Sequence, residues 1–390
     1  MLFSLSVMLL LGIVSLLISR QVKLPALIFY LLVGIIIGPY ALNWINGPII
    51  ELAAEIKKFA LIVILIRAGL SLDFHDLKKV GKPAIFMCFV PATVEIIGSI
   101  IIGPMLFGIN ILDAFMIGTV IAAVSPAVVV PRMIQMLEQK KGTQQGIPQI
   151  ILAGSSADDI YVLVLFSALL SMQTQGHVNY LSFLSLPVSI FTGILVGWVI
   201  ALLMNKLLIA MKLSTTANVV FILAGSLALM TLESHSNNWF SGLISIIVMT
   251  MRIVKAQPNN IMSFKHQFNQ LWFVAEMFLF MLVGMATNVQ TALSFGWLPI
   301  LFIIITSLFR MLGVYLALLP SNLTTKERVF TMGAYIPKAT VQAAIGSIPL
   351  SMGLEIGPLI LTIAVLEILL TAPLGALWID KSQDKLIGKS

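Results

Sequence analysis

Residues 151–166 read ILAGSSADDIYVLVLF, with two adjacent acids, Asp158 and Asp159, in the middle of a mostly apolar run. A helix that crosses the hydrocarbon core of a bilayer needs about 20 mostly apolar residues. The run from residue 147 to 173 is long enough to do so. A charge near the bilayer centre is costly unless it is paired or hydrated, so each one is a functional candidate. The stretch therefore predicts a membrane helix that carries an ion-handling site.

The composition of the whole chain also indicates a membrane protein. Of 390 residues, 59% are hydrophobic and 10% are charged, whereas soluble proteins carry about 25% charged residues. The net charge is +7, but no basic run exceeds two residues and none alternates with aromatic residues, which excludes nucleic-acid binding. The single cysteine, Cys88, excludes a disulfide framework and a multi-cysteine metal site.

Apolar runs separated by polar segments predict an all-α integral membrane protein with about 13 transmembrane helices. The runs lie near residues 2–19, 24–39, 52–72, 83–106, 112–131, 147–173, 181–205, 215–232, 239–251, 268–286, 294–319, 328–350 and 356–379. The second and the ninth are short. The first run leads into basic residues without a small-residue cleavage site, so we interpret it as a retained helix.

Basic residues gather in every second connection, as expected when Lys and Arg mark cytoplasmic loops. These residues are Arg20, Lys23, Lys78, Lys79, Lys82, Arg132, Lys140, Lys141, Lys206, Lys212, Arg252, Lys255, Lys265, Lys326, Arg328, Lys381, Lys385 and Lys389. With an odd number of helices, the pattern predicts an N-terminus outside and a C-terminus in the cytoplasm. We expect a multi-pass protein surrounded by lipid in a bacterial inner or plasma membrane.

The two halves of the chain resemble each other. LIVILIRAGLSLDFHDL around Gly69 matches MFLFMLVGMATNVQTAL around Gly284, and the same offset of 215 residues takes Glu95 to Arg310. An offset of seven apolar runs is odd, so the second copy is predicted to be inverted relative to the first. The predicted organisation is a six-helix repeat at 1–173, a linker helix at 174–212, a second six-helix repeat at 213–380 and a cytoplasmic tail at 381–390.

The chemistry of the paired acids points to a cation. Neighbouring helical positions point about 100° apart, so Asp158 and Asp159 cannot bond to each other. Two carboxylates this close and this far from water cannot both stay ionised without a cation, which is the condition for exchanging a proton for a metal ion near neutral pH. Ser155, one turn earlier, offers the neutral oxygen that a hard cation also needs. The alternative is structural: both acids pair with basic residues and hold helices together.

Two prolines, Pro126 and Pro337, interrupt apolar runs at corresponding places in the two halves. Proline removes a backbone hydrogen bond, and freed backbone groups inside a membrane are tolerated where they line a cavity or find other partners. Corresponding breaks predict an ion site where two broken helices cross. The carbonyls around Val124 and Ser125 and the hydroxyls of Thr119 and Ser125 would then be available to the cation.

Three further charged residues lie inside apolar runs. Glu95 and Arg310 occupy equivalent repeat positions with opposite charges, so we expect them to form a buried salt bridge, whose role is either functional or only structural. Arginine keeps its proton at physiological pH and cannot carry protons. Lys338 follows the second break, where it can neutralise helix C-terminal dipoles.

At this point the chain resembles the monovalent cation/proton antiporters, in particular the sodium/hydrogen antiporters with paired aspartates of the NHA type. The resemblance rests on LIRAGLSLD at 65–73, VPATVE at 90–95, AAVSPAVVVP at 122–131, SSADDI at 155–160, SLFRMLG at 307–313 and YIPKATVQAAIGS at 335–347. These motifs occur in both halves, so the resemblance spans essentially the whole chain.

The resemblance implies a homodimer whose core domain moves against a scaffold domain, an elevator-type form of alternating access. It makes Asp159 the main carboxylate for Na+ and protons, with Asp158 beside it. Several electrogenic relatives have a lysine where this chain has Arg310, which leaves the transport stoichiometry open.

The predicted function is secondary antiport of Na+ or Li+ against protons, without enzymatic activity and without a cofactor. Three alternatives remain open at the level of sequence. One is a K+/H+ antiporter of the same fold, and another is a bile-acid-type sodium-coupled symporter, which needs a larger polar cavity. The third is an intramembrane aspartyl protease, which needs two aspartates from different helices.

Overall fold

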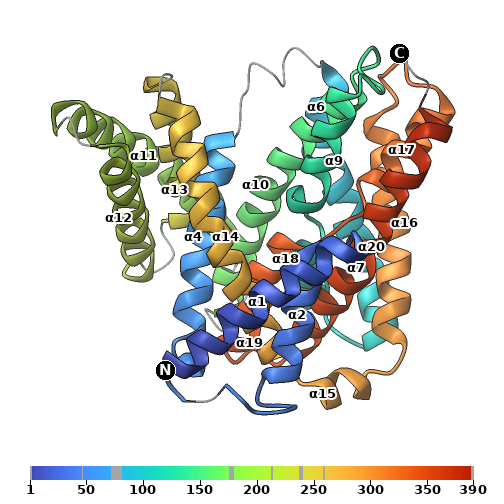
Figure 1. Ribbon diagram of the computed structural model, residues 1–390, viewed down its shortest axis with the longest axis horizontal. Helices are drawn as coiled ribbons and strands as arrows, with labels where there is room; N and C mark the ends of the chain where they lie inside the picture. Colours follow the sequence, from blue (N-terminus) through green and yellow to red (C-terminus); the bar gives the residue numbers. More distant parts are fainter. Residues whose placement is uncertain are drawn as a thin grey trace. The chain divides into compact units, whose positions relative to one another are not determined.

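The computed structural model describes residues 2–45, 47–71, 81–174, 180–211, 214–236, 240–257 and 260–387, and these form helices joined by loops (Figure 1). The all-α fold class predicted from the sequence is therefore confirmed. Of the basic residues in the predicted loops, Lys78, Lys79, Lys212 and Lys389 lie outside the described ranges.

The helices follow one another along the chain without an intervening sheet in the described ranges. They are α1 (Leu2–Val22), α2 (Ala26–Ile37), α3 (Pro48–Glu51), α4 (Ala53–Ser71), α6 (Lys82–Met87), α7 (Val90–Phe107), α8 (Ile111–Ile121), α9 (Pro126–Glu138), α10 (Ile147–Thr174), α11 (Tyr180–Met211), α12 (Thr215–Ser234), α13 (Gly242–Ala256), α14 (Ile261–Ala286), α15 (Val289–Ser294), α16 (Leu298–Ala317), α17 (Thr325–Ala334), α18 (Thr340–Ile345), α19 (Ile348–Ser351) and α20 (Gly357–Leu386).

Within the described ranges, nine helical segments are long and apolar enough to cross a membrane. The other four predicted runs correspond to helices with identifiable departures. Helices α2 and α13 have 12 and 15 residues, α4 carries four charged residues, and the run at 328–350 is divided between α17 and α18. A multi-pass membrane protein is thus established, and the count of thirteen stays a prediction.

The chain divides into two compact units. Unit 1 comprises residues 1–57, 73–162 and 277–390, and unit 2 comprises residues 58–72 and 163–276. Three of the four boundaries fall inside α4, α10 and α14. Every residue predicted for the ion site belongs to unit 1. The predicted repeat boundaries are a different division of the chain and stay a prediction.

Unit 2 is held together by close packing of α11 against α13. A Cβ atom at Gly197 would lie 2.6 Å from the carbonyl oxygen of Ser245, so glycine is required for this approach. The Ser245 hydroxyl donates a 2.7 Å hydrogen bond to the carbonyl oxygen of Gly193 on the facing helix. Small residues that let helix backbones approach are typical of packing in membranes, where helices gain little from the hydrophobic effect.

In unit 1, α7 packs along α16 and places Glu95 beside Arg310. A Cβ at Gly98 would lie 2.5 Å from the ring of Phe309, and one at Gly313 would lie 2.7 Å from the Cα of Pro91. Glycines on both helices therefore allow an approach that larger residues would prevent. This approach lets the charged side chains of the two helices meet away from lipid.

Two interruptions of the helices occur in unit 1, at the positions expected from the prolines. Residues 122–125 separate α8 from α9, which begins at Pro126, and residues 335–339 separate α17 from α18 and include Pro337. The Ser125 amide donates a 2.7 Å hydrogen bond to the carbonyl oxygen of Pro337, so the two breaks are in direct contact.

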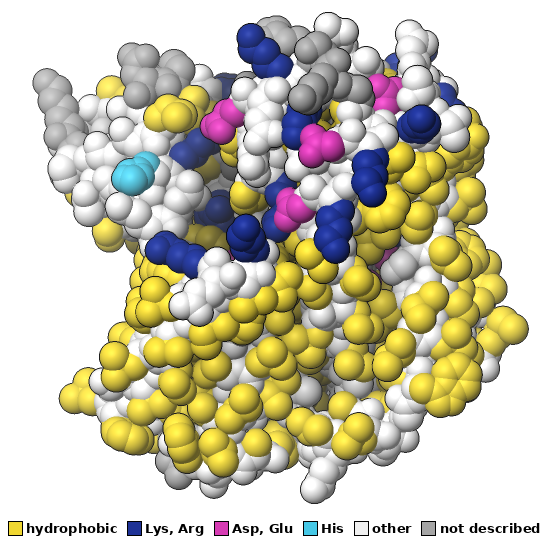
Figure 2. Space-filling view, turned by 45° about the vertical axis from the view of Figure 1, so that its right-hand side comes forward, with side chains coloured by type: hydrophobic (Ala, Val, Ile, Leu, Met, Phe, Trp, Pro, Cys, Tyr) yellow, Lys and Arg dark blue, Asp and Glu magenta, His cyan; other side chains and the backbone are white. Residues whose placement is uncertain are grey.

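Helix α9 and the loop that follows it are joined to the last part of α20 by ion pairs near the surface of unit 1. Arg132 lies 3.0 Å from Asp380, and Lys141 lies 2.6 Å from Asp384. On the face that Figure 2 shows, Lys and Arg side chains lie in the upper half, and the lower half is mainly hydrophobic. A band of exposed apolar side chains is what a lipid environment requires of a membrane protein.

Candidate ion-binding site

The paired acids lie on α10 and are buried. Asp158 is 0% exposed and Asp159 is 5% exposed. The backbone N–H of Val124, in the first helix break, donates a 2.9 Å hydrogen bond to Asp158 Oδ2. The other oxygen of this carboxylate, Oδ1, accepts no hydrogen bond from any described residue. One oxygen of Asp158 is thus committed to the protein, whereas the second is available to a ligand.

The break between α8 and α9 leaves three carbonyl oxygens without their helical partners, as expected before a proline. The Ile121 carbonyl accepts from Lys338 Nζ, and the Ala122 carbonyl accepts from Arg310 Nη1. The Gln342 side chain donates to the Ala123 carbonyl at 2.8 Å. Side chains from the second half of the chain therefore satisfy the freed backbone of the first half.

Arg310 is the most connected side chain of the site. Its Nη1 lies 2.8 Å from Glu95 Oε2 and its Nη2 lies 2.7 Å from Asp158 Oδ2. Its Nε donates to the Tyr335 carbonyl at 2.7 Å, and its guanidinium carbon lies 4.9 Å from the centre of the Tyr335 ring. The planar fork of arginine suits this task because it donates in several fixed directions at once. The sequence predicts Glu95 as its partner, and the structure adds Asp158.

Lys338 lies in the second break and reaches the same glutamate. Its Nζ lies 2.6 Å from Glu95 Oε2, so this one oxygen faces both cationic side chains. Its Nζ also donates to the carbonyl of Ile121 in the last turn of α8. The predicted neutralisation of a helix C-terminus by Lys338 stays a prediction. Its backbone N–H donates to Thr371 Oγ1 on α20 at 3.0 Å, which fixes the second break against that helix.

The hydroxyls of the other side chains predicted as cation ligands donate to carbonyls of their own helices or have no hydrogen-bond partner among the described residues. The hydroxyls of Thr119 and Ser155 donate to carbonyls three residues earlier in their own helices, at 2.8 and 3.2 Å. These bonds do not join either side chain to the aspartates. The Ser125 hydroxyl is buried, and among the described residues it has no hydrogen-bond partner. Of the neutral oxygens predicted as cation ligands, Ser125 is thus the one with an uncommitted hydroxyl at the break.

Sequence reasoning did not assign Gln342 and Tyr335 to the site. Gln342 is fully buried and donates to the carbonyls of Ile121 and Ala123. Its position four residues after Lys338, inside an apolar run, is the feature of the sequence that could have pointed to Gln342. Tyr335 contributes its ring and carbonyl to Arg310, and its hydroxyl donates to the Met87 carbonyl at 3.1 Å. Nothing in its apolar neighbourhood distinguishes it in the sequence.

The buried charges of this region do not balance. Among the described residues around the two helix breaks, four buried carboxyl groups accompany two buried cationic groups, and they belong to Glu95, Asp158, Asp159, Glu367, Arg310 and Lys338. With all six ionised the sum is −2. An uncompensated buried charge is strongly unfavourable, so the region favours the uptake of cations or protons. Both are the species that an exchanger handles.

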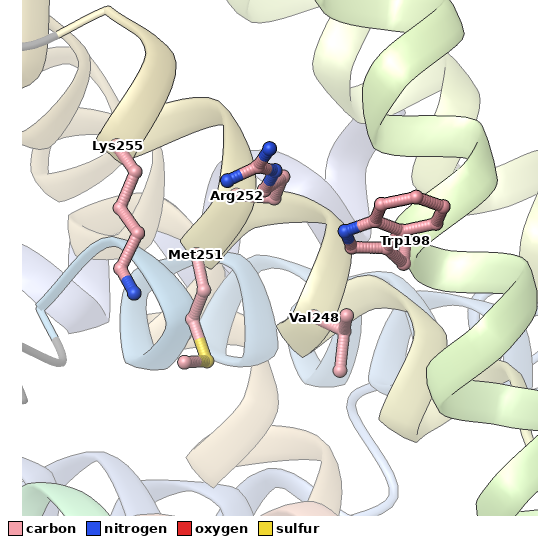
Figure 3. Close-up of a pocket in the computed structure, with 5 residues that line it drawn as sticks. All are labelled: Trp198, Val248, Met251, Arg252 and Lys255. Carbon is pink, nitrogen blue, oxygen red and sulfur yellow. The ribbon is translucent and has the colours of Figure 1, made fainter.

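A pocket in unit 2 contains none of the predicted site residues. It has a volume of about 220 Å³ and is lined by Trp198 on α11 and by Val248, Met251, Arg252 and Lys255 on α13 (Figure 3). The candidate ion site is instead a set of closely packed polar groups around two helix breaks. Such a site suits a desolvated ion better than a large organic solute.

The second break depends on the absence of a side chain at Gly375 on α20. A Cβ there would lie 2.1 Å from Cγ of Pro337, whose ring cannot turn away. We expect Gly375→Ala to lower stability by about 1–3 kcal/mol, as overpacking does, and to reduce transport. Gly12→Ala is the control, because its Cβ would meet the flexible end of Met277. Equal melting temperatures and transport rates for the two variants would contradict this account of the break.

Comparison with known proteins decides the family. The sequence model described as "Sodium/hydrogen exchanger, transmembrane" matches residues 5–380. The chain belongs to the sodium/hydrogen exchanger family. It is 28% identical to the human protein "Sodium/hydrogen exchanger 9B2" over 392 residues, covering 94% of this chain and 70% of that protein. It is 30% identical to the protein of the same name from Bison bison bison, covering 94% and 71%.

A solved structure shows the same fold. The sodium proton antiporter MjNhaP1 from Methanocaldococcus jannaschii superposes with a TM-score of 0.84 at 21% identity, covering 99% of each chain. Family membership makes the chain a transporter rather than an enzyme, acting on transported ions without a cofactor. It therefore removes the protease and solute-symporter alternatives. These relatives come from mammals and an archaeon, so they give no support to the expected bacterial membrane.

Proposed function

We propose that the chain exchanges Na+ for protons at one site formed by Asp158 and Asp159. The observation that carries the proposal is the burial of this pair beside a helix break, with Asp158 Oδ1 uncommitted among the described residues. Sodium prefers oxygen ligands, and the two carboxylates together with Ser125 Oγ offer them. We further propose Thr119, Ser155 and the Val124 carbonyl as more distant contributors. Li+ is expected to share the site because it is also a small, hard cation that prefers oxygen ligands.

Arg310 is proposed to hold Asp158 in place and to set the local potential. Its charge is permanent, so it neither takes up nor releases the exchanged proton. Asp159 is proposed as the carboxylate that alternates between Na+ and H+. Glu95 is proposed to compensate the charges of Arg310 and Lys338, since its Oε2 lies within 2.8 Å of both. Na+ and a proton then use the same pair of acids in turn.

We propose elevator-type alternating access with unit 1 as the moving part. All residues of the proposed ion site lie in unit 1, so movement of this unit would carry the complete site. Unit 2 is proposed as the scaffold through which two copies form a homodimer. The alternation of basic connections supports an N-terminus outside and a C-terminus in the cytoplasm.

The test is transport by the purified protein in liposomes with a pH indicator inside. Addition of Na+ or Li+ on one side of the membrane is expected to drive protons in the opposite direction to the cation. This proton movement is expected to stop when the Na+ or Li+ gradient is removed. K+ is the comparison ion, because a K+/H+ antiporter of the same fold would respond to it instead. Proton movement that no monovalent cation changes would contradict the proposal.

Competition at one site predicts how pH controls transport. Lowering pH protonates the carboxylates, and protonated acids neither attract nor coordinate Na+. The apparent Km for Na+ is therefore expected to fall as pH rises from 6 to 9, by at most about tenfold per pH unit for one competing proton. By linkage, Na+ binding releases protons to the same extent. The measurement is the initial exchange rate against Na+ concentration at each pH.

No histidine is needed for this behaviour. His235 and His266 are exposed, and His75 and His177 lie outside the described residues. Replacing all four is expected to leave the pH dependence of the Na+ Km as in wild type. A wild-type Km that stays constant with pH excludes simple competition. Loss of the dependence only in the four-histidine variant would place the pH sensor away from the aspartates.

A further inference from the structure

Glu367, near the middle of α20, is a buried acid that the proposed exchange cycle does not use. It is 0% exposed, and among the described residues neither of its carboxyl oxygens has a hydrogen-bond partner. Glu327 provides the contrast within this chain. It is also buried, but its Oε2 accepts from the amide and the hydroxyl of Thr324 at 2.7 and 2.8 Å in a helix cap. Among the described residues, Glu367 has no comparable hydrogen bonds that would offset the free energy of burying its carboxyl group.

The surroundings of Glu367 connect it to the ion site. Thr371, one turn later on α20, donates to the Glu367 carbonyl at 2.8 Å and accepts from the Lys338 amide at 3.0 Å. The carboxyl group interacts electrostatically with Lys338, Glu95 and Arg310. A series of interacting charged groups thus leads from Glu367 to Asp158. After Glu367 and Lys338, its ion pairs are Lys338–Glu95 at 2.6 Å, Glu95–Arg310 at 2.8 Å and Arg310–Asp158 at 2.7 Å.

The other elements packed against α20 bring no further charge to Glu367. Helices α2, α15, α18 and α19 contain no charged residue. Helix α16 contributes Arg310, and the charged residues on the remaining neighbours α8, α9 and α17 are Asp113, Arg132, Glu138, Lys326, Glu327 and Arg328. Arg132 pairs with Asp380 near the end of α20, and Glu327 is engaged in its helix cap. Glu138 and Lys326 are exposed, and the charged groups that interact with Glu367 are Lys338, Glu95 and Arg310.

We infer that Glu367 is a second proton-binding site, linked to the Na+ site through Lys338, Glu95 and Arg310. The inference rests on the proposed function. An ionised Glu367 adds one negative charge to the region and partly compensates the positive charge of Lys338. Both effects make the electrostatic potential at the aspartate pair more negative, so the pair attracts Na+ more strongly. A protonated Glu367 removes that contribution. Na+ binding therefore favours release of the Glu367 proton, in addition to the proton displaced from the aspartates.

The expected size of the effect follows from Coulomb's law. A unit charge about 10 Å from a binding site, at an effective dielectric constant of about 20, changes an ion's affinity by roughly tenfold. The sign depends on pH. At low pH the carboxyl group of wild-type Glu367 is protonated, so it carries no charge, like the amide of a Gln variant. At high pH the wild-type carboxyl group is ionised, whereas the amide of the variant stays neutral. Glu367→Gln is thus expected to bind Na+ about tenfold more weakly than wild type once Glu367 is ionised, and the difference is expected to shrink towards acid pH.

The experiment measures the Na+ affinity and the protons released per bound Na+ for purified protein in weakly buffered solution from pH 6 to 9. The variants are Glu367→Gln and Glu367→Met, the latter of similar volume and without a polar atom to satisfy. Glu355→Gln, exposed just before α20, is the matched control and is expected to behave as wild type. Both Glu367 variants are expected to release fewer protons per Na+ than wild type. Wild-type affinity and proton release at every pH in a folded Glu367 variant would overturn the inference.

Asp159→Asn separates this inference from the function on which it rests. If Asp159→Asn loses Na+-dependent proton release while both Glu367 variants match wild type, the proposed function stands and the second proton site is wrong. If wild type itself releases no protons on addition of Na+, the proposed function fails, and the inference fails with it. Weaker Na+ binding towards alkaline pH together with fewer released protons in the Glu367 variants supports both.

Discussion

Replacing Asp159 with Asn is expected to abolish Na+-driven proton movement and to leave the protein folded. An amide neither binds nor releases the exchanged proton in the physiological range, and it carries no charge to hold Na+. Folding should be preserved because the change removes one of two adjacent buried acids and with it a like-charge repulsion. The two measurements are proton movement in liposomes and the melting temperature of the purified variant.

Asp384→Asn is the matched control for this experiment. Asp384 pairs with Lys141 at the surface, where its side chain is 64% exposed. Exposed ion pairs contribute little stability, about 0–1 kcal/mol, so this variant is expected to transport and melt as wild type. Full Na+-driven proton flux by Asp159→Asn would contradict the assignment of this carboxylate. An unfolded Asp159→Asn variant would contradict the argument from charge repulsion.

Much of the fold could be predicted because membrane helices leave strong signals in sequence. Long apolar runs identify spans without knowledge of their packing, and prolines in two of them mark the breaks at 122–125 and 335–339. Short or charged helices are harder to identify. Helix α4 carries Glu55, Lys57, Lys58 and Arg67, so composition alone does not establish it as a span. The division into two units depends on contacts between distant segments, which periodicity does not reveal.

Those residues of the candidate site could be predicted whose charge inside an apolar run is energetically unfavourable whatever its neighbours are. Buried charges such as Glu95, Arg310 and Lys338 are conspicuous in any apolar run, and the offset of 215 residues relates the first two. The partners of a charge are harder to predict, because they depend on how three or four helices meet. No pattern in the sequence therefore indicates that Arg310 binds Asp158, or that the carbonyls of Ile121, Ala122 and Ala123 accept hydrogen bonds from side chains of the second half.

Glu95→Gln and Arg310→Gln are expected to destabilise the protein more than they inactivate it. Glu95→Gln leaves Arg310 and Lys338 as two buried cations without the carboxylate charge they share. Arg310→Gln removes the donors that bind Glu95, Asp158 and the carbonyls of Ala122 and Tyr335. Breaking a buried ion pair from one side costs roughly 3–5 kcal/mol. Each variant should therefore melt well below wild type, and the molecules that stay folded should still exchange ions.

The control for this second prediction is Arg132→Gln. Arg132 also binds an aspartate, Asp380 at 3.0 Å, but that aspartate is 43% exposed. Its loss is expected to cost about 0–1 kcal/mol. Arg310→Lys adds a graded test, because lysine keeps the charge but cannot donate along the four directions that the guanidinium uses. Its melting temperature should fall between those of wild type and Arg310→Gln. Equal melting temperatures for wild type, Glu95→Gln and Arg310→Gln would show that the buried pair does not hold α7 and α16 together.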